Sequence, residues 1–304
     1  MRGVDERGRP VVLVRKQTGA ADIFCGKGLI ADGSRGNGRR GWELLTRSAQ
    51  AIRANRYVSD QFAEQPTEIG QGSRMLMLSA APLVCRKPTG HAMRTAALDL
   101  AAEFIDDVLD RHFDPATGVF SEYIDGKTRQ RTTYLDPGHA NEFAGLGLAA
   151  IEAMAAEPAL LSDRRRQLIQ RAKRELPRVL ISSTGLGWNA AFGGLHKAVD
   201  NATGAVLNDE MPWWSLPETM RAAARSAEVA EDAATADRCL ELLRLCHNAY
   251  FGRYLNRDKM LFPFQTISGS SGEVVDKVPA VPEGDPLYHS NLALLDMLTV
   301  LDRL

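Results

Sequence analysis

The sequence has few cysteines, and their spacing does not suit a metal or redox site. Four cysteines occur in 304 residues, and no two of them have the short CxxC spacing of zinc-binding or redox motifs. Cys239 and Cys246 are seven positions apart in an apparent helix, which puts them on one face. This arrangement predicts two small buried apolar side chains rather than a disulfide. The cysteines therefore indicate a reduced, cytosolic protein.

Long apolar runs and an excess of either charge are also lacking. The N-terminal segment has no apolar signal core, and no run is long enough to cross a membrane. Lys and Arg together number 37 against 38 for Asp and Glu, so the net charge is only −1. That balance excludes a global basic field for nucleic acid or an anionic membrane. We therefore expect neither of these as a partner.

What the sequence does contain is a series of helical patterns. Shorter strand-like pieces lie between them at 119–124, 194–199 and 260–266. A helix pair followed by a β-ribbon recurs with a period of about 50–60 residues, which predicts an all-α toroid of helical hairpins with its ribbon-bearing loops at one end. Apolar residues recur at helical spacing in the stretches 41–54, 72–85, 93–112, 139–156, 162–181, 216–230, 232–252 and 288–303.

Residues 1–40 fit this pattern less well. The segment 5–16 is typical of the end of a β-ribbon with a turn at Arg7-Gly8. A ribbon requires a partner strand, and none precedes this one in the sequence. We therefore expect the chain to start in the middle of an architectural unit.

Among six histidines, His139 has the most suggestive neighbours, in the segment Asp136–Glu142. Pro137 and Gly138 end a loop and a helical pattern follows, so His139 lies at a helix start with Glu142 on the same face. An exposed imidazole with a carboxylate to orient it suits general acid–base catalysis. An N-cap histidine with a capping glutamate would give the same pattern, and that alternative stays open.

A second candidate is the pair Trp213 and Trp214, followed one turn later by Glu218. Adjacent side chains point in different directions, so one indole can enter the core while the other lines a cavity. Flat indole faces suit the apolar C–H faces of a sugar ring. A packed aromatic pair with a first-turn glutamate favoured by the helix dipole is equally compatible with the pattern.

The third candidate is His289, which again opens a helix after a loop. Two histidines at two loop-to-helix junctions would be able to face opposite sides of one substrate carbon. One would remove a proton and the other would return it on the far side. Stereochemical inversion requires such an arrangement.

These elements, in this order and spacing, resemble the N-acylglucosamine 2-epimerase family, whose fold is an (α/α)6 barrel. The matching motifs are PGHxxE at Pro137–Glu142, WWxxxE at Trp213–Glu218 and the late His289. Two smaller features agree, namely the D-x-x-G-R-P turn at Asp5–Pro10 and the glycine pair Gly193-Gly194. Each motif is weak alone, but all of them occur in register, from about residue 4 to the C-terminus.

The resemblance implies a sugar 2-epimerase that needs no metal or other cofactor. Polarisation of the C1 aldehyde acidifies the C2 proton of an open-chain sugar, and its removal gives an enediolate. Reprotonation on the other face yields the 2-epimer, whereas reprotonation at C1 yields a ketose. The implied acid–base pair is His139 and His289, and the implied substrate-binding residues are Glu142, Trp214, Glu218 and Arg74.

Family members extend further at the N-terminus, so the resemblance implies one barrel domain over residues 1–304 that lacks about the first three helices. A homodimer would be natural if helical surface is left uncovered.

Three alternatives to the epimerase stay open. The first is an aldose–ketose isomerase of the same superfamily, and the second is a non-catalytic homologue that binds a saccharide. The third is a glycoside hydrolase or lyase that uses Glu142 and Glu218 as a carboxylate pair. The two histidines argue against this third alternative, as does the absence of Asp-rich loops around the carboxylates.

Overall fold

The computed structural model describes residues 2–4, 10–12, 18–58, 68–256, 262–263, 266–275 and 288–304. Helices dominate this part of the chain, which confirms the expected all-α class. A 3-10 turn lies at Pro158–Leu160, and two π-helical turns, η2 (Tyr250–Tyr254) and η5 (Tyr288–Leu292), flank the C-terminal helices. The helices are α1 (Ala20–Asp32), α2 (Arg35–Arg53), α3 (Gly72–Leu78), α4 (Ala80–Arg86), α5 (His91–Arg111), α6 (Pro137–Ala155), α7 (Asp163–Gly187), α8 (Ser215–Val229), α9 (Ala233–Ala249) and α10 (Ala293–Leu301).

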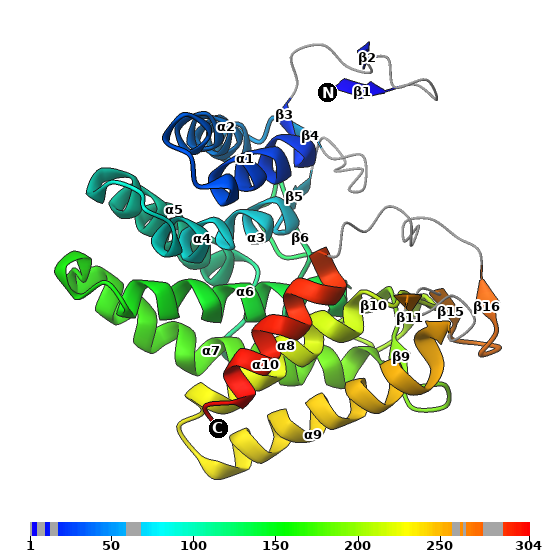
Figure 1. The fold of residues 1–304 in the computed structure, drawn as a ribbon. Helices are drawn as coiled ribbons and strands as arrows, with labels where there is room; N and C mark the ends of the chain where they lie inside the picture. The colour runs from blue at the N-terminus through cyan, green and yellow to red at the C-terminus, as the bar shows by residue number, and fades with distance from the viewer. Residues whose placement is uncertain are drawn as a thin grey trace.

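Successive helices pair as hairpins that stack in chain order (Figure 1). The hairpin partners are α1 with α2, α3 and α4 with α5, α6 with α7, and α8 with α9. A second set of contacts joins α1 to α4, α3 and α4 to α6, α6 to α8, and α8 to α10. These joined helices form an inner layer, and α2, α5, α7 and α9 form an outer layer. Such alternation is the pattern of an α/α toroid.

Short strands occupy the loops, and most of them gather on one side of the helical stack (Figure 1). Strands occur within each of the stretches 119–124, 194–199 and 260–266 expected from the sequence, although 260–261 and 264–265 lie outside the described residues. The pairings are β1 (Arg2–Val4) with β2 (Pro10–Val12), β3 (Thr18–Gly19) with β4 (Tyr57–Val58), β5 (Glu68–Gly70) with β6 (Tyr123–Asp125), β7 (Tyr134–Leu135) with β10 (Ala198–Asp200) and β11 (Val206–Asn208), β8 (Trp188–Asn189) with β9 (Gly194–Leu195), β12 (Glu210–Met211) with β15 (Thr266–Ser268) and β16 (Val274–Val275), and β13 (Leu255–Asn256) with β14 (Phe262–Pro263).

One expectation about the N-terminal ribbon is wrong. Strand β2 does have a preceding partner, because Arg2–Val4 pairs with it in antiparallel register. The expected turn at Arg7-Gly8 lies outside the described residues.

Helix α6 runs through the centre of the fold. Every residue from Pro137 to Ile151 is buried. A helix that is covered on all sides must be apolar or small-residue-rich all round, and the many Ala, Gly and Leu residues of α6 meet that demand. The polar side chains at its N-terminal end therefore lie inside the protein.

Helix α1 was not among the helical stretches expected from the sequence. Its interior contains Gly26, which lowers helix propensity. In the structure, a Cβ on Gly26 would lie 3.0 Å from the carbonyl oxygen of Gly41, and one on Gly41 would lie 2.5 Å from that of Gly26. The two glycines thus allow α1 and α2 to pack with their backbones close together, and this packing offsets the weak propensity.

The stretch 72–85, expected as one helix, is divided at Ser79 into α3 and α4. Pro82 lies near the start of α4 and has no N–H to donate to the carbonyl of Leu78, against which its ring would also clash in a continuous helix. The break follows from that proline.

Two further expectations concerned membrane-spanning helices and the cysteines of α9. Within the described ranges, no helix is long and apolar enough to cross a membrane. Cys239 and Cys246 are both buried and free on α9, as the sequence predicted.

Candidate active site

The expected site residues lie at the N-terminal ends of neighbouring inner helices. His139 and Glu142 occupy the first turns of α6, Trp214 is the N-cap residue of α8, and Glu218 lies in the first turn of α8. His289 lies in η5, immediately before α10. Since α8 packs against both α6 and α10, these three helix starts converge, and five of the six expected residues come together there.

Asp136, not His139, is the N-cap residue of α6. Its Oδ1 accepts a hydrogen bond from the backbone N–H of His139 at 3.2 Å, and Pro137 follows at the first helical position. The alternative of a capping histidine is therefore wrong. The His139 ring presents Nδ1 to two carboxylates, at 3.2 Å from Asp136 Oδ2 and 3.1 Å from Glu122 Oε1. With Nδ1 committed in this way, proton exchange with a substrate would use Nε2.

The surroundings of His139 favour its charged form. Burial opposes the charge, but Asp136 and Glu122 outweigh burial and raise the pKa of His139 above its ordinary value, although Lys197 counteracts them. Burial also opposes ionisation of Asp136, yet His139 and Lys197 keep the pKa of that carboxyl below its usual range. Glu122 is held in turn by Gln71, whose Nε2 lies 3.0 Å from Glu122 Oε2.

Trp214 lies against both histidines. Its ring centroid is 5.2 Å from that of His139 and 5.3 Å from that of His289, with interplanar angles of 31° and 36°. The Lys197 ammonium lies 5.0 Å from the centre of the indole. The adjacent Trp213 is also buried, and its ring meets that of His289 edge to face with centroids 6.3 Å apart. A division of the two indoles between core and cavity therefore stays a prediction.

Glu218 is the carboxylate partner of His289. Its Oε1 lies 3.0 Å from His289 Nδ1, and its Oε2 forms an ion pair with the buried guanidinium of Arg221 one turn along α8. Both oxygens of Glu218 are thereby engaged. This geometry repeats that of His139, because each imidazole has Nδ1 fixed by an acidic side chain.

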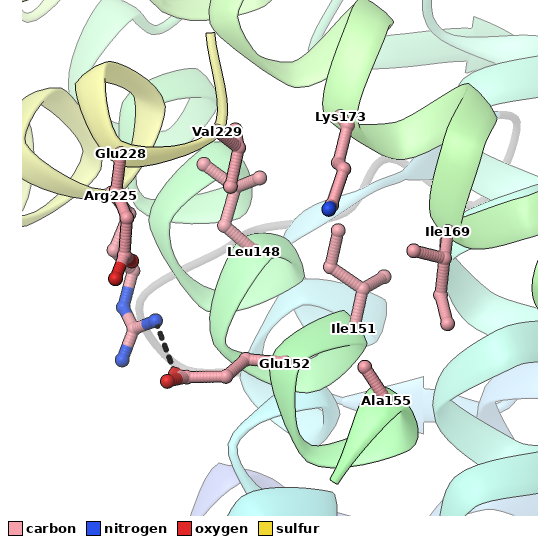
Figure 2. Close-up of a pocket in the computed structure, with 9 residues that line it drawn as sticks. All are labelled: Leu148, Ile151, Glu152, Ala155, Ile169, Lys173, Arg225, Glu228 and Val229. Carbon is pink, nitrogen blue, oxygen red and sulfur yellow. Dashed lines mark hydrogen bonds and ion pairs between the residues drawn. The ribbon is translucent and has the colours of Figure 1, made fainter. Parts of the chain in front are cut away.

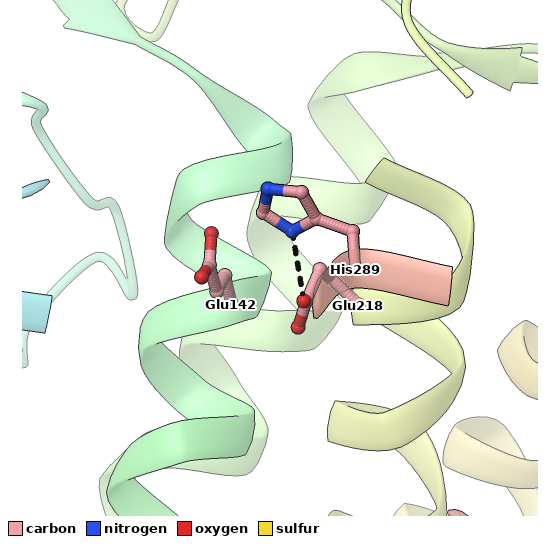
Figure 3. Close-up of side chains that lie close together, drawn as sticks. All are labelled: Glu142, Glu218 and His289. Carbon is pink, nitrogen blue, oxygen red and sulfur yellow. Dashed lines mark hydrogen bonds and ion pairs between the residues drawn. The ribbon is translucent and has the colours of Figure 1, made fainter. Parts of the chain in front are cut away.

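Glu142 lies across from Glu218. Burial and the neighbouring charge of Glu218 raise the pKa of Glu142 above its ordinary value. Its Oε1 accepts a hydrogen bond of 3.4 Å from the hydroxyl of Tyr288. Figure 3 shows Glu142 on α6 facing Glu218 on α8, with the His289 imidazole beside both.

Glu142, Glu218 and His289 also form the group of described residues best placed to hold a cation. One ligand atom from each lies within 4.8 Å of the others. The two carboxylates, however, already have buried counter-charges in Arg221 and in Lys27 of α1, both of which interact with them electrostatically. We therefore do not assign a metal to this group.

A separate depression of about 260 Å³ lies at the opposite ends of α6 and α8 (Figure 2). Its floor is apolar, and its rim has an ion pair between Arg225 and Glu152 at 2.7 Å. Its lining includes no histidine or cysteine. Since Glu152 is about 20 Å along α6 from His139 at 1.5 Å per residue, this depression is not part of the histidine site.

Arg74, the sixth expected site residue, contacts helix α5 and strand β5. Its Nε forms an ion pair with Asp107 of α5, and its Nη1 donates to the carbonyl of Gly70 at 3.0 Å. Asp107 also bonds to Arg111. These contacts draw the guanidinium toward α5.

Sequence reasoning missed several residues that shape the site. Asp136 had a usable signal, because an Asp three residues before a helical His is a typical N-cap. Arg221 also had a signal, because it stands three residues after Glu218 in a predicted helix. Glu122, Lys197 and Tyr288 had none, since each acts through a contact that only the folded chain creates.

Solved structures that share this fold include sugar epimerases. A cellobiose 2-epimerase from Bacillus thermoamylovorans B4167 matches with a TM-score of 0.64 and 12% identity, over 93% of this chain and 71% of that one. A sugar epimerase from a ruminal bacterium gives a TM-score of 0.67, 11% identity and the same coverage. A cellobiose 2-epimerase from Spirochaeta thermophila DSM 6192 gives 0.64 and 14%, over 92% of this chain and 69% of that one.

The sequence family and the shared toroid fold together place the chain among the carbohydrate epimerases and isomerases. The sequence profile of the N-acylglucosamine 2-epimerase (GlcNAc 2-epimerase) family matches residues 38–280. The chain belongs to this family. A search of curated protein sequences finds no significant match.

Proposed function

We propose that the protein inverts C2 of an open-chain aldose of the N-acylglucosamine type by two-base proton transfer between His139 and His289. The observation that supports this most directly is the matched environment of the two imidazoles. Each has Nδ1 fixed by a carboxylate, and both lie against Trp214. An apolar sugar face resting on the indole would then have one imidazole on each side of C2.

The electrostatics support one order of steps. Asp136 and Glu122 outweigh burial and raise the pKa of His139, which suits His139 to the part of the acid. His289 would take the C2 proton, and the electron pair would move onto the C1 oxygen to give the enediolate. His139 would then protonate C2 on the opposite face. In the reverse direction the two histidines exchange these tasks.

A glycoside hydrolase fits this geometry poorly. A hydrolase requires one carboxyl to donate a proton and another to attack or activate water. Both oxygens of Glu218 contact cationic or imidazole partners, His289 and Arg221, which disfavours a protonated Glu218 as the general acid. The homodimer, the cytosolic location and a substrate-binding task for Arg74 stay predictions.

The test is proton exchange at C2 in D2O, with N-acylglucosamine, mannose, glucose and cellobiose as substrates. The expected result is deuterium at C2 together with formation of the 2-epimer. His139→Gln and His289→Gln should each reduce epimerisation by about 100-fold or more. Each variant keeps one base, so it should still exchange the C2 proton of one of the two epimers. The epimer that exchanges should differ between the two variants. His247→Gln, at an exposed position on α9, is the matched control.

Absence of deuterium at C2 in every sugar would overturn the proposal. Deuterium at C1 of a ketose product would indicate the isomerase instead.

A further inference from the structure

Lys27 is a buried lysine that the epimerisation chemistry does not use. It lies on α1, and only 9% of it is exposed. Lysines are almost never buried without partners, because the ammonium loses its hydration. Its partners therefore indicate what it does.

The Lys27 ammonium bonds to the break between α3 and α4. Its Nζ donates to the carbonyl of Leu76 at 3.3 Å and to Ser79 Oγ at 3.0 Å. The broken helix is what exposes a carbonyl and a hydroxyl at this position. These two bonds join the first helix of the fold to its inner neighbour.

The same ammonium also lies over two aromatic rings. Nζ is 4.9 Å from the ring centre of Tyr288 and 4.6 Å from that of Phe24. The two rings meet edge to face with their centres 5.1 Å apart. Contacts of this kind are stronger where water is excluded. Through them α1 reaches η5, the turn that holds His289.

Tyr288 continues the connection into the site. Its hydroxyl donates to Glu142 Oε1 at 3.4 Å, and its ring lies against that of the next residue, His289, with centres 4.8 Å apart. Burial, together with Glu142 and Glu218, raises the pKa of Tyr288 well above its ordinary value. The phenol is therefore neutral and is a hydrogen-bond donor across the physiological range.

We propose that Lys27 is a positioning residue for the epimerase site: by holding the Tyr288 ring it fixes η5, and so sets the places of His289 and Glu142. This inference rests on the proposed function for its catalytic consequence, but the fixing of η5 does not depend on it. Lys27 can keep the positive charge that contacts the Tyr288 ring at neutral pH. Burial lowers the pKa of Lys27 only to about 8, because Glu142 and Glu218 oppose that change.

A purely structural tie is the competing explanation, because Lys27 also joins α1 to the α3–α4 break. A tie of that kind would affect only the stability of the fold. A positioning residue would affect kcat and the local order of η5 as well.

Four variants separate these explanations. Lys27→Met removes the charge but keeps the stem, and Lys27→Arg keeps a donor and a charge. Tyr288→Phe removes only the hydroxyl. Lys173→Met is the control, because Lys173 lines the depression at the other end of the helices. The readouts are kcat and KM for C2 exchange, hydrogen–deuterium exchange of the peptide that covers 288–292, and thermal unfolding.

We expect Lys27→Met to lower kcat by about 10-fold or more with little change in KM, because the base is misplaced rather than the substrate lost. Amide exchange in 288–292 should rise in Lys27→Met and return toward the wild-type value in Lys27→Arg. Tyr288→Phe should lower kcat through Glu142. The double variant Lys27→Met/Tyr288→Phe should have a kcat no lower than that of the slower single variant, since the two substitutions act on the same chain of contacts.

Wild-type kcat and wild-type amide exchange in Lys27→Met, with only a lower Tm, would overturn the proposal in favour of a structural tie. If Lys27→Met does not fold, Lys27→Gln, which also removes the charge from the Tyr288 ring, decides by the same readouts. If the wild-type protein exchanges no C2 proton, the proposed function fails, and the amide exchange of 288–292 still decides whether Lys27 fixes η5.

Discussion

One carboxylate, that of Asp136, both begins helix α6 and holds the ring of His139. Its Oδ1 caps the backbone N–H of His139 at 3.2 Å, while its Oδ2 lies 3.2 Å from Nδ1 of the same residue. The signal that starts the helix thus also orients the imidazole at its first turn.

Asp136→Asn separates these two tasks. Asn is a good N-cap, so α6 should form, but the neutral amide no longer stabilises the imidazolium. The pKa of His139 should fall. In the direction that uses His139 as the acid, kcat/KM should then decline at a lower pH than in the wild-type protein. Asp232→Asn, at the exposed N-cap of α9, should leave the pH profile unchanged.

The same variant gives a stability prediction whose sign is fixed. The folded pKa of His139 lies above its unfolded value, so this stabilisation is fully present below pH of about 6.5 and is lost as pH rises through the folded pKa. The difference in the free energy of unfolding between wild type and Asp136→Asn should therefore shrink as pH rises from about 6.5 through the folded pKa of His139. Urea unfolding at several pH values measures it, and a difference that grows with pH would contradict the assignment.

Glu218→Gln should be costly for both activity and stability. The change leaves the buried Arg221 guanidinium without its counter-charge, which we expect to destabilise the fold by about 3 kcal/mol. It also removes the acidic partner of His289, so kcat should fall by about 100-fold. Glu228→Gln, which breaks a surface pair with Arg303 at the far end of α8, should cost less than about 1 kcal/mol and leave kcat unchanged. Equal stability losses in the two variants would contradict this account.

Gly138→Ala should disturb Trp214 directly. A Cβ at this position would lie 2.8 Å from Trp214 Cη2 and 2.9 Å from Ser215 Cβ, and an indole is too rigid to yield easily. We expect kcat to fall by about 10-fold or more as α6 and α8 move apart. Gly185→Ala on α7 has open space for a Cβ and should be neutral or stabilising. Crystal structures of both variants would show whether the indole moves.

Arg74→Met tests whether Arg74 contacts substrate. Its bonds to Asp107 and Gly70 predict a loss of stability of about 2 kcal/mol with little change in KM. An increase in KM with unchanged stability would instead support the substrate-binding task expected from the sequence. Urea unfolding and steady-state kinetics on one preparation distinguish the two outcomes.

Much of the helical framework could be predicted, because most helices have a clear apolar period. Helix α1 could not, since its stability depends on the close approach of Gly26 and Gly41, and a glycine in isolation indicates a helix breaker. The break at Ser79 was predictable from Pro82, but a strong apolar run obscured it.

The candidate site could likewise be predicted only in part. Five site residues belong to short sequence motifs that can be recognised without the structure, namely His139, Glu142, Trp214, Glu218 and His289. Their partners do not, because Glu122 reaches His139 from a different loop and Tyr288 reaches Glu142 from a turn 146 positions away. Such contacts depend on the assembled fold rather than on sequence spacing.

The position of Trp214 against both imidazoles has an optical consequence. Indole emission is quenched by a nearby imidazolium more strongly than by a neutral imidazole, so the fluorescence of Trp214 should change as either ring gains or loses its proton. Subtracting the emission of Trp214→Phe would isolate this signal from the other three tryptophans. The protein thus contains its own spectroscopic reporter of the protonation state of its two candidate bases, readable without substrate.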